Sequence, residues 1–149
     1  MLDPQLAFSL TGPLVLAAWA ALILSLFVKP VRPIAWTVAQ FAVPAILALA
    51  YILLIWAGFS EAQGGGYGSI EEIRALFASD SALVAGWFHY LAFDLFVGSW
   101  IVTDGIERRM PALLILPCLP LTLLFGPLGL LLFLLLRLAF ARRVAGEML

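Results

Sequence analysis

The sequence predicts an all-α integral membrane protein, a single membrane domain over residues 1–149 built as a four-helix transmembrane bundle with one short amphipathic surface helix. Of its 149 residues, 64% are hydrophobic and only 11% are charged, whereas soluble domains carry about 45–50% apolar and about 25% charged residues. Stretches without charge cover residues 4–28, 33–60 and 110–136, and each is longer than the roughly 20 apolar residues that span hydrocarbon. Any site must therefore lie inside the bilayer or at its two faces.

The first two predicted helices form an antiparallel scaffold pair. The first covers about residues 6–28 and ends at Lys29-Pro30, where a proline stops the helix and a lysine marks an interface. The second covers about residues 34–59, with Trp36 and Trp56 near its ends as interfacial anchors. Pro44 is expected to kink it.

A polar segment separates these helices from the rest of the chain. EAQGGGYGS reads as a flexible linker, and Ser69 with Glu72 forms the capping box of a helix over about residues 70–79. We expect this helix to lie on the membrane surface. Packing against its own bundle and covering a lipid-accessible site as a lid are both open alternatives. Its apolar face consists of Ile70, Ile73, Leu76 and Phe77.

The third predicted helix covers about residues 82–104 and carries ionisable groups at membrane depth. Its last turn places Asp104 four residues before Arg108, the spacing of a helical ion pair. Asp104, Glu107, Arg108 and Arg109 are interpreted as an interfacial charge network.

The fourth apolar segment, about residues 111–137, is predicted as one kinked membrane span. Pro117, Pro120 and the Gly126-Pro127 step interrupt it. The alternative is a re-entrant loop that turns back at Gly126-Pro127, because each half of about 15 residues is too short to cross a bilayer. Counting lysines and arginines does not decide the orientation, because a four-helix topology puts equal numbers on the two sides.

Asp94 and His89 are the predicted catalytic residues. An aspartate at the middle of a membrane helix costs about 2.5–3.5 kcal/mol on insertion, so we expect Asp94 to face the bundle interior and, as a protonated acid, to donate a proton. His89 is the chain's single histidine and the second candidate proton-handling group. A structural hydrogen bond of Asp94 and simple packing of His89 are the competing interpretations.

Aromatic residues on the third helix predict a lipophilic groove between it and the fourth segment. Asp94 follows Trp87 by seven positions, which puts the two on one helix face. Prolines weaken the fourth segment and make it the deformable wall. The predicted substrate-binding residues are Trp87, Phe93, Phe96, Trp100 and Thr122.

Composition also excludes several classes of site. One cysteine, Cys118, and one histidine exclude an internal disulfide and a Cys/His metal cluster built by one chain. A net charge of −1 gives no electrostatic footprint for nucleic acid. We expect no metal site. The start of the chain lacks the positive n-region of a signal peptide and the basic, serine-rich character of a plastid transit peptide.

The stretch WFHYLAFDLFVGSWIVTDG resembles the signature of the abscisic-acid-deficient-four-like family, small membrane proteins of plastids, cyanobacteria and other bacteria that are linked to neoxanthin synthesis. The resemblance is close over the C-terminal half and extends to the whole chain in length and layout. The matching residues are Trp87, His89-Tyr90, Asp94-Leu95-Phe96, Arg108-Arg109 and Gly126-Pro127-Leu128-Gly129.

What the resemblance implies is a four-helix membrane protein of carotenoid metabolism. In the plant reaction a xanthophyll epoxide opens and a proton is lost to form an allene, a cofactor-independent isomerisation for which Asp94 and His89 have suitable chemistry. A non-catalytic pigment-binding or assembly subunit of a photosynthetic membrane complex is the alternative. A small proton or solute transporter is the weakest reading. Expected partners are the lipid bilayer, a carotenoid or other lipophilic ligand, and complex subunits or a second copy, in a bacterial inner or photosynthetic membrane.

Overall fold

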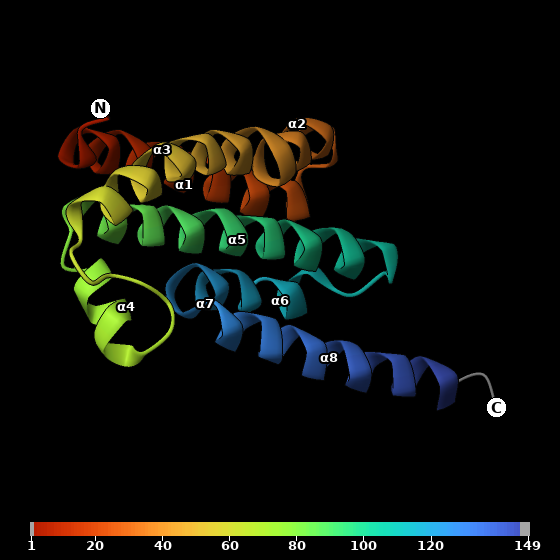
Figure 1. Ribbon diagram of the computed structural model, residues 1–149. Coiled ribbons are helices and arrows are strands. Elements are labelled where there is room, and N and C mark those ends of the chain that lie inside the picture. Colours follow the sequence, from red (N-terminus) through yellow and green to blue (C-terminus); the bar gives the residue numbers. More distant parts are fainter. Residues whose placement is uncertain (1, 147–149) are drawn as a thin grey trace. The chain divides into compact units, whose positions relative to one another are not determined.

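The computed structural model describes residues 2–146, with side chains as far as residue 140. Every regular element in this part of the chain is a helix (Figure 1). The helices, in chain order, are α1 (Pro4–Phe27), η1 (Lys29–Val31), α2 (Arg32–Thr37), η2 (Val38–Ala42), α3 (Val43–Glu61), α4 (Ile70–Leu76), α5 (Asp80–Glu107), α6 (Ala112–Ile115), α7 (Cys118–Phe125) and α8 (Pro127–Gly146).

Three of these helical stretches are long and apolar enough to cross a membrane. They are α1, the continuous run from η1 to α3 over Lys29–Glu61, and α5. Their mean hydropathies are 2.1, 2.4 and 1.3, and they have 24, 33 and 28 residues. These stretches coincide with the first three predicted spans and are candidate membrane-spanning helices by length and composition, as in a membrane protein.

The irregularity expected at Pro44 takes the form of a π-helical turn. The wide turn η2 occupies the five residues immediately before α3 and contains Gln40, whose carbonyl would accept the hydrogen bond that Pro44 has no N–H to donate. The helix therefore widens where the proline removes a backbone bond, and it continues on the other side.

The fourth predicted segment is not one kinked helix, and that prediction is corrected. It consists of α6, α7 and α8, and the chain reverses at Gly126, so that α8 returns along α7 (Figure 1). Gly126 has φ +46° and ψ −93°, a conformation that L side chains rarely adopt, and Pro127 then begins a new helix. The two apolar legs, Ala112–Phe125 and Pro127–Phe140, are each shorter than a span.

The described chain divides into two compact units, and α5 contributes to both. The first unit contains residues 2–16 and 43–93, and the second contains residues 17–42 and 94–146. Fully buried side chains of the first unit include Leu47, Leu54, Leu76, Ala85 and Phe88. Those of the second include Leu22, Leu95, Ile101, Ile115, Leu119 and Phe133.

Each unit has a contact at which a glycine lets another group approach a helix closely. In the first unit a Cβ on Gly58 of α3 would lie 2.6 Å from the Cβ of Ala82 at the start of α5. In the second, the buried ring of Trp19 lies against Gly98 so closely that an added methyl group would overlap it. Small residues at helix contacts are typical of membrane helices.

Candidate functional site

An open groove of about 750 Å³ lies beside the first half of α5 in the first unit. Asp80, Leu83, Trp87 and Tyr90 recur at the spacing of one helix face and form its α5 wall. The rings of Phe8 and Trp87 lie 6.4 Å apart, and Trp87 stacks on Tyr90 at 5.4 Å. The remaining lining residues are Gln5, Phe8, Phe77, Val84 and Gly86. A mostly apolar groove with a few polar groups is typical of a site for a lipophilic ligand.

A second, more polar pocket of about 340 Å³ lies in the same unit. Tyr51 and Ile55 from α3, Tyr67 from the linker, and Gly86 and His89 from α5 line it together with Phe77. The ring centroids of Tyr51 and His89 are 6.0 Å apart. His89 also stacks on Phe93 at 4.6 Å. The pocket thus places two phenol groups and one imidazole around a common space.

Tyr67 belongs to the polar linker outside the membrane-spanning helices. Partial loss of hydration, followed by the nearby Tyr51 phenol, raises the pKa of Tyr67 above its ordinary value. Its ring meets that of Phe59 edge-on at 5.6 Å. Tyr67 is therefore a neutral phenol, able to donate a proton, over the whole physiological range.

Phe77 and Gly86 line both hollows. A Cβ on Gly86 would lie 2.7 Å from Cε1 of Phe77, so the Phe77 ring lies directly against the backbone of α5. The Phe77 side chain therefore lies where the apolar groove and the polar pocket adjoin.

The segment that carries Phe77 is fixed at both ends by hydrogen bonds. The Ser69 hydroxyl accepts from the Glu72 N–H at 3.1 Å, and a Glu72 carboxylate oxygen accepts from the Gly68 N–H at 2.9 Å. The predicted Ser69 N-cap of α4 is confirmed, whereas the Glu72 carboxylate accepts from the N–H of Gly68 and not from that of Ser69, as a full capping box would require. At the other end, the carboxylate of Glu61 accepts from the hydroxyls of Ser79 at 2.6 Å and Ser81 at 3.0 Å. Leu76, on the predicted apolar face of α4, is fully buried.

Asp94 begins the α5 portion of the second unit, and its carboxyl lies against the hairpin between α7 and α8. A Cβ built on Gly126 would be 2.9 Å from Asp94 Oδ1 and 3.4 Å from Oδ2. The carboxyl therefore sits at the first turn of α8, where the helix dipole favours negative charge. A side chain on residue 126 would therefore collide with this carboxyl.

The two legs of the hairpin pack through Gly129 of α8. An added Cβ there would overlap the backbone and hydroxyl of Thr122. Thr122 is fully buried and donates its hydroxyl proton to the Cys118 carbonyl at 2.8 Å. The described contacts of Thr122 are those of helix packing.

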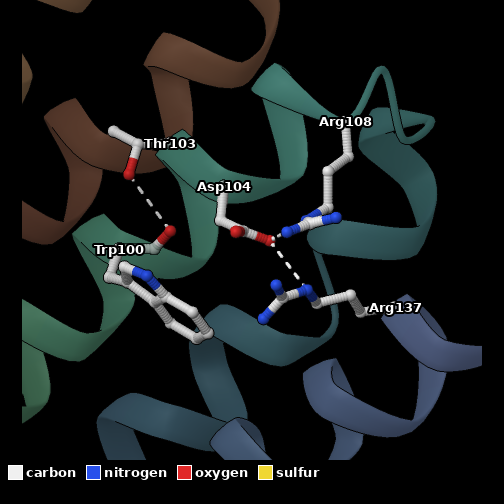
Figure 2. Close-up of polar contacts among 5 residues, drawn as sticks. All are labelled: Trp100, Thr103, Asp104, Arg108 and Arg137. Carbon is white, nitrogen blue, oxygen red and sulfur yellow. Dashed lines mark hydrogen bonds and ion pairs between the residues drawn. The ribbon is translucent and has the colours of Figure 1, made fainter. Parts of the chain in front are cut away.

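A charged cluster joins α5 to α8 at the end of α5. One carboxylate oxygen of Asp104 lies 2.7 Å from Arg108 Nε and 3.3 Å from Arg137 Nε, as Figure 2 shows. The Arg137 guanidinium also lies 5.7 Å from the ring centroid of Trp100. The ion pair predicted between Asp104 and Arg108 is confirmed, whereas Arg137 was not expected in it.

The residues predicted to form the site are divided between the two units. Trp87 lines the apolar groove and His89 the polar pocket, with Phe93 stacked on His89. In the second unit, Phe96 is half exposed and Trp100 packs edge-on to Phe133 at 5.4 Å. The predicted groove between the third helix and the fourth segment draws on both units and stays a prediction.

Sequence reasoning missed Tyr51, Tyr67 and Phe77. Tyr51 is the only tyrosine in α3, which is a detectable signal, because a tyrosine within an apolar helix usually needs a partner for its hydroxyl. Tyr67 lies in a glycine-rich segment and Phe77 on an expected packing face, so no local pattern distinguishes either of them.

Comparison with known proteins gives one match. The family model described as ABA DEFICIENT 4-like matches residues 6–133. That range includes α1 from residue 6 onward, the elements from η1 to α7 and the first part of α8. It also includes the Asp94 contact and every residue that lines the two hollows except Gln5. A search of the curated proteins finds no match, and neither does a search of the solved structures.

Proposed function

The chain belongs to the ABA DEFICIENT 4-like family, and on this premise we propose that it binds a carotenoid within the membrane and isomerises it. The family links the chain, a membrane protein, to the carotenoid pathway. The proposed step is the opening of a xanthophyll epoxide with loss of a proton, which changes the bonding of the substrate without changing its composition.

The observation that carries this proposal is the apolar groove beside α5. A polyene is flat and rigid, and the stacked pair Trp87 and Tyr90 with Phe8 opposite offers aromatic faces to it. The groove is open rather than enclosed, so a ligand dissolved in lipid can enter sideways without crossing water. Trp87 is 45% exposed, which leaves much of its ring available to such a ligand.

The adjoining polar pocket supports catalysis rather than binding alone. An epoxide opening of this kind needs a base at carbon and an acid at oxygen. His89 lines the pocket and is the proposed base. The sequence nominates Asp94 as the acid, and that assignment stays a prediction.

The test is expression of the chain in a host that accumulates an epoxy-carotenoid, followed by chromatography of extracted pigments and absorption spectroscopy of the purified protein. We expect a new isomer of unchanged mass that an empty vector does not produce. Pigment bound in stoichiometric amount but left unaltered would favour the non-catalytic pigment-binding subunit. Absence of both product and bound pigment would overturn the proposal.

Pigment binding, the first part of the proposal, is tested separately with a matched pair of variants. Trp87→Ala removes the stacked ring from the groove, and we expect about tenfold less retained pigment, which corresponds to about 1.4 kcal/mol. Trp56→Ala removes a tryptophan of α3 that is 80% exposed and lies outside both hollows. Retention equal to that of the unaltered protein is expected for this control, and equal losses in both variants would argue against the groove.

A further inference from the structure

We propose that Tyr51 is the proton donor of the reaction and that it works opposite His89 in the polar pocket of the first unit. This inference rests on the proposed function, because it assigns a residue to the same isomerisation. It differs from the sequence-based assignment, which gives the role of the acid to Asp94.

The geometry that points to Tyr51 is the convergence of three elements on one space. Tyr51 comes from α3, Tyr67 from the linker and His89 from α5, and all three line a pocket of about 340 Å³. The rings of Tyr51 and His89 lie 6.0 Å apart and are tilted by 51°. That separation leaves room for the end of a ligand between a proton donor and a proton acceptor.

Tyr67 makes Tyr51 different from an isolated phenol. The two tyrosines are close enough to interact, and Tyr67 is 61% exposed at the linker. The pair thus reaches from the pocket to the polar surface segment. Because Tyr67 is exposed and Tyr51 lies deeper, Tyr51 is the one placed to meet the substrate, and Tyr67 is a positioning residue.

The proposed isomerisation needs no external reagent. The Tyr51 hydroxyl gives its proton to the epoxide oxygen as the C–O bond breaks, and the bonding pair stays on that oxygen. His89 takes a proton from the neighbouring carbon, and the C–H pair becomes the new C=C bond. The imidazolium then returns a proton to the Tyr51 phenolate. Atoms and charge balance, and the product is an isomer of the substrate.

Other acids are less well placed for this role. The Asp94 carboxyl lies against Gly126 in the second unit and lines neither hollow. Tyr90 stacks on Trp87 in the apolar groove and does not line the polar pocket. Tyr90 is therefore the matched control, because the same change to phenylalanine can be made there.

The kinetic test compares Tyr51→Phe, Tyr67→Phe and Tyr90→Phe in lipid vesicles loaded with the epoxy-carotenoid. We expect Tyr51→Phe to lower kcat at least a hundredfold with KM within about twofold, because a positioned acid contributes about 10²–10⁴ in rate. Tyr67→Phe should lower kcat less and alter the alkaline limb of the pH profile. Tyr90→Phe should change KM more than kcat.

A second test does not depend on turnover. Because His89 is the chain's single histidine, its imidazole resonances can be read without assignment after histidine-selective ¹⁵N labelling. Tyr51→Phe should shift them, and the Tyr90→Phe control should leave them in place.

The outcomes separate the two proposals. Unaltered protein that converts no pigment removes the isomerase function, while shifted His89 resonances in Tyr51→Phe would still support the shared pocket. Unaltered protein that converts pigment, with Tyr51→Phe equally active over the whole pH range, overturns the role of Tyr51 and leaves the isomerase standing. Unshifted resonances in Tyr51→Phe overturn the pocket itself.

Discussion

Replacing Gly126 by alanine should destabilise the hairpin between α7 and α8 for two separable reasons. At φ +46° and ψ −93° a residue with a Cβ is strained by about 1–3 kcal/mol. The new methyl group would also lie 2.9 Å from Asp94 Oδ1, about 0.5 Å short of ordinary van der Waals contact at 3.4 Å. Overpacking of this kind costs about 1–3 kcal/mol. If the two costs add, we expect a total loss of about 2–6 kcal/mol in the free energy of unfolding.

The measurement is reversible unfolding of the protein in detergent or lipid, followed by tryptophan fluorescence. Gly12→Ala is the control, because a Cβ at Gly12 meets nothing within 4 Å, and this change should be neutral or add up to about 1 kcal/mol. In an Asp94→Ala background the collision disappears and only the backbone strain remains, so Gly126→Ala should cost less there. Equal stability of Gly126→Ala and the unaltered protein would refute the reasoning, and an unchanged cost in the Asp94→Ala background would refute the contact.

Three further predictions concern other contacts. Asp94→Asn keeps the shape of the side chain at the hairpin, so pigment conversion per folded molecule should fall less than tenfold; a loss above a hundredfold in fully folded protein would restore Asp94 as the acid. Asp104→Asn removes the carboxylate that two partly exposed arginines share, and the loss in unfolding free energy should be at most about 1 kcal/mol and smaller at high salt; a melting temperature independent of salt in both proteins would contradict this. Gly86→Ala should displace the ring of Phe77, which is 39% exposed, and so weaken pigment binding with little change in melting temperature. Unaltered binding would mean that Phe77 does not border the occupied groove.

Local patterns were enough to predict the elements that depend on local physics. Hydropathy over a window located three spans, because burying backbone in hydrocarbon requires an uninterrupted apolar helix. The N-cap bond at Ser69 and the ion pair between Asp104 and Arg108 followed from spacing alone. The two contacts join residues three or four positions apart, and the spans depend only on the composition of one continuous segment.

The reversal at Gly126 and the polar pocket depend on information that a local pattern does not contain. The Gly-Pro step is compatible with a kink or a turn, and the sign of φ at Gly126 decides between them. The sequence could place next to His89 only residues of its own helix. The two tyrosines that share its pocket, Tyr51 and Tyr67, come from α3 and the linker. Candidate catalytic residues could therefore be nominated one by one from the sequence, and their pairing could not.

The glycine contacts invert the usual relation between residue size and tolerance to mutation. Many leucines of this chain lie on the outside of its helices, where one aliphatic side chain can replace another against lipid. The sites with least freedom are the smallest ones, such as Gly98 beneath Trp19 and Gly129 beneath Thr122, where a single added carbon has no space. Substitutions should therefore be tolerated at the exposed aliphatic positions and excluded at the tightly packed glycines. A pattern of retained glycines would then identify the fold more reliably than overall sequence similarity.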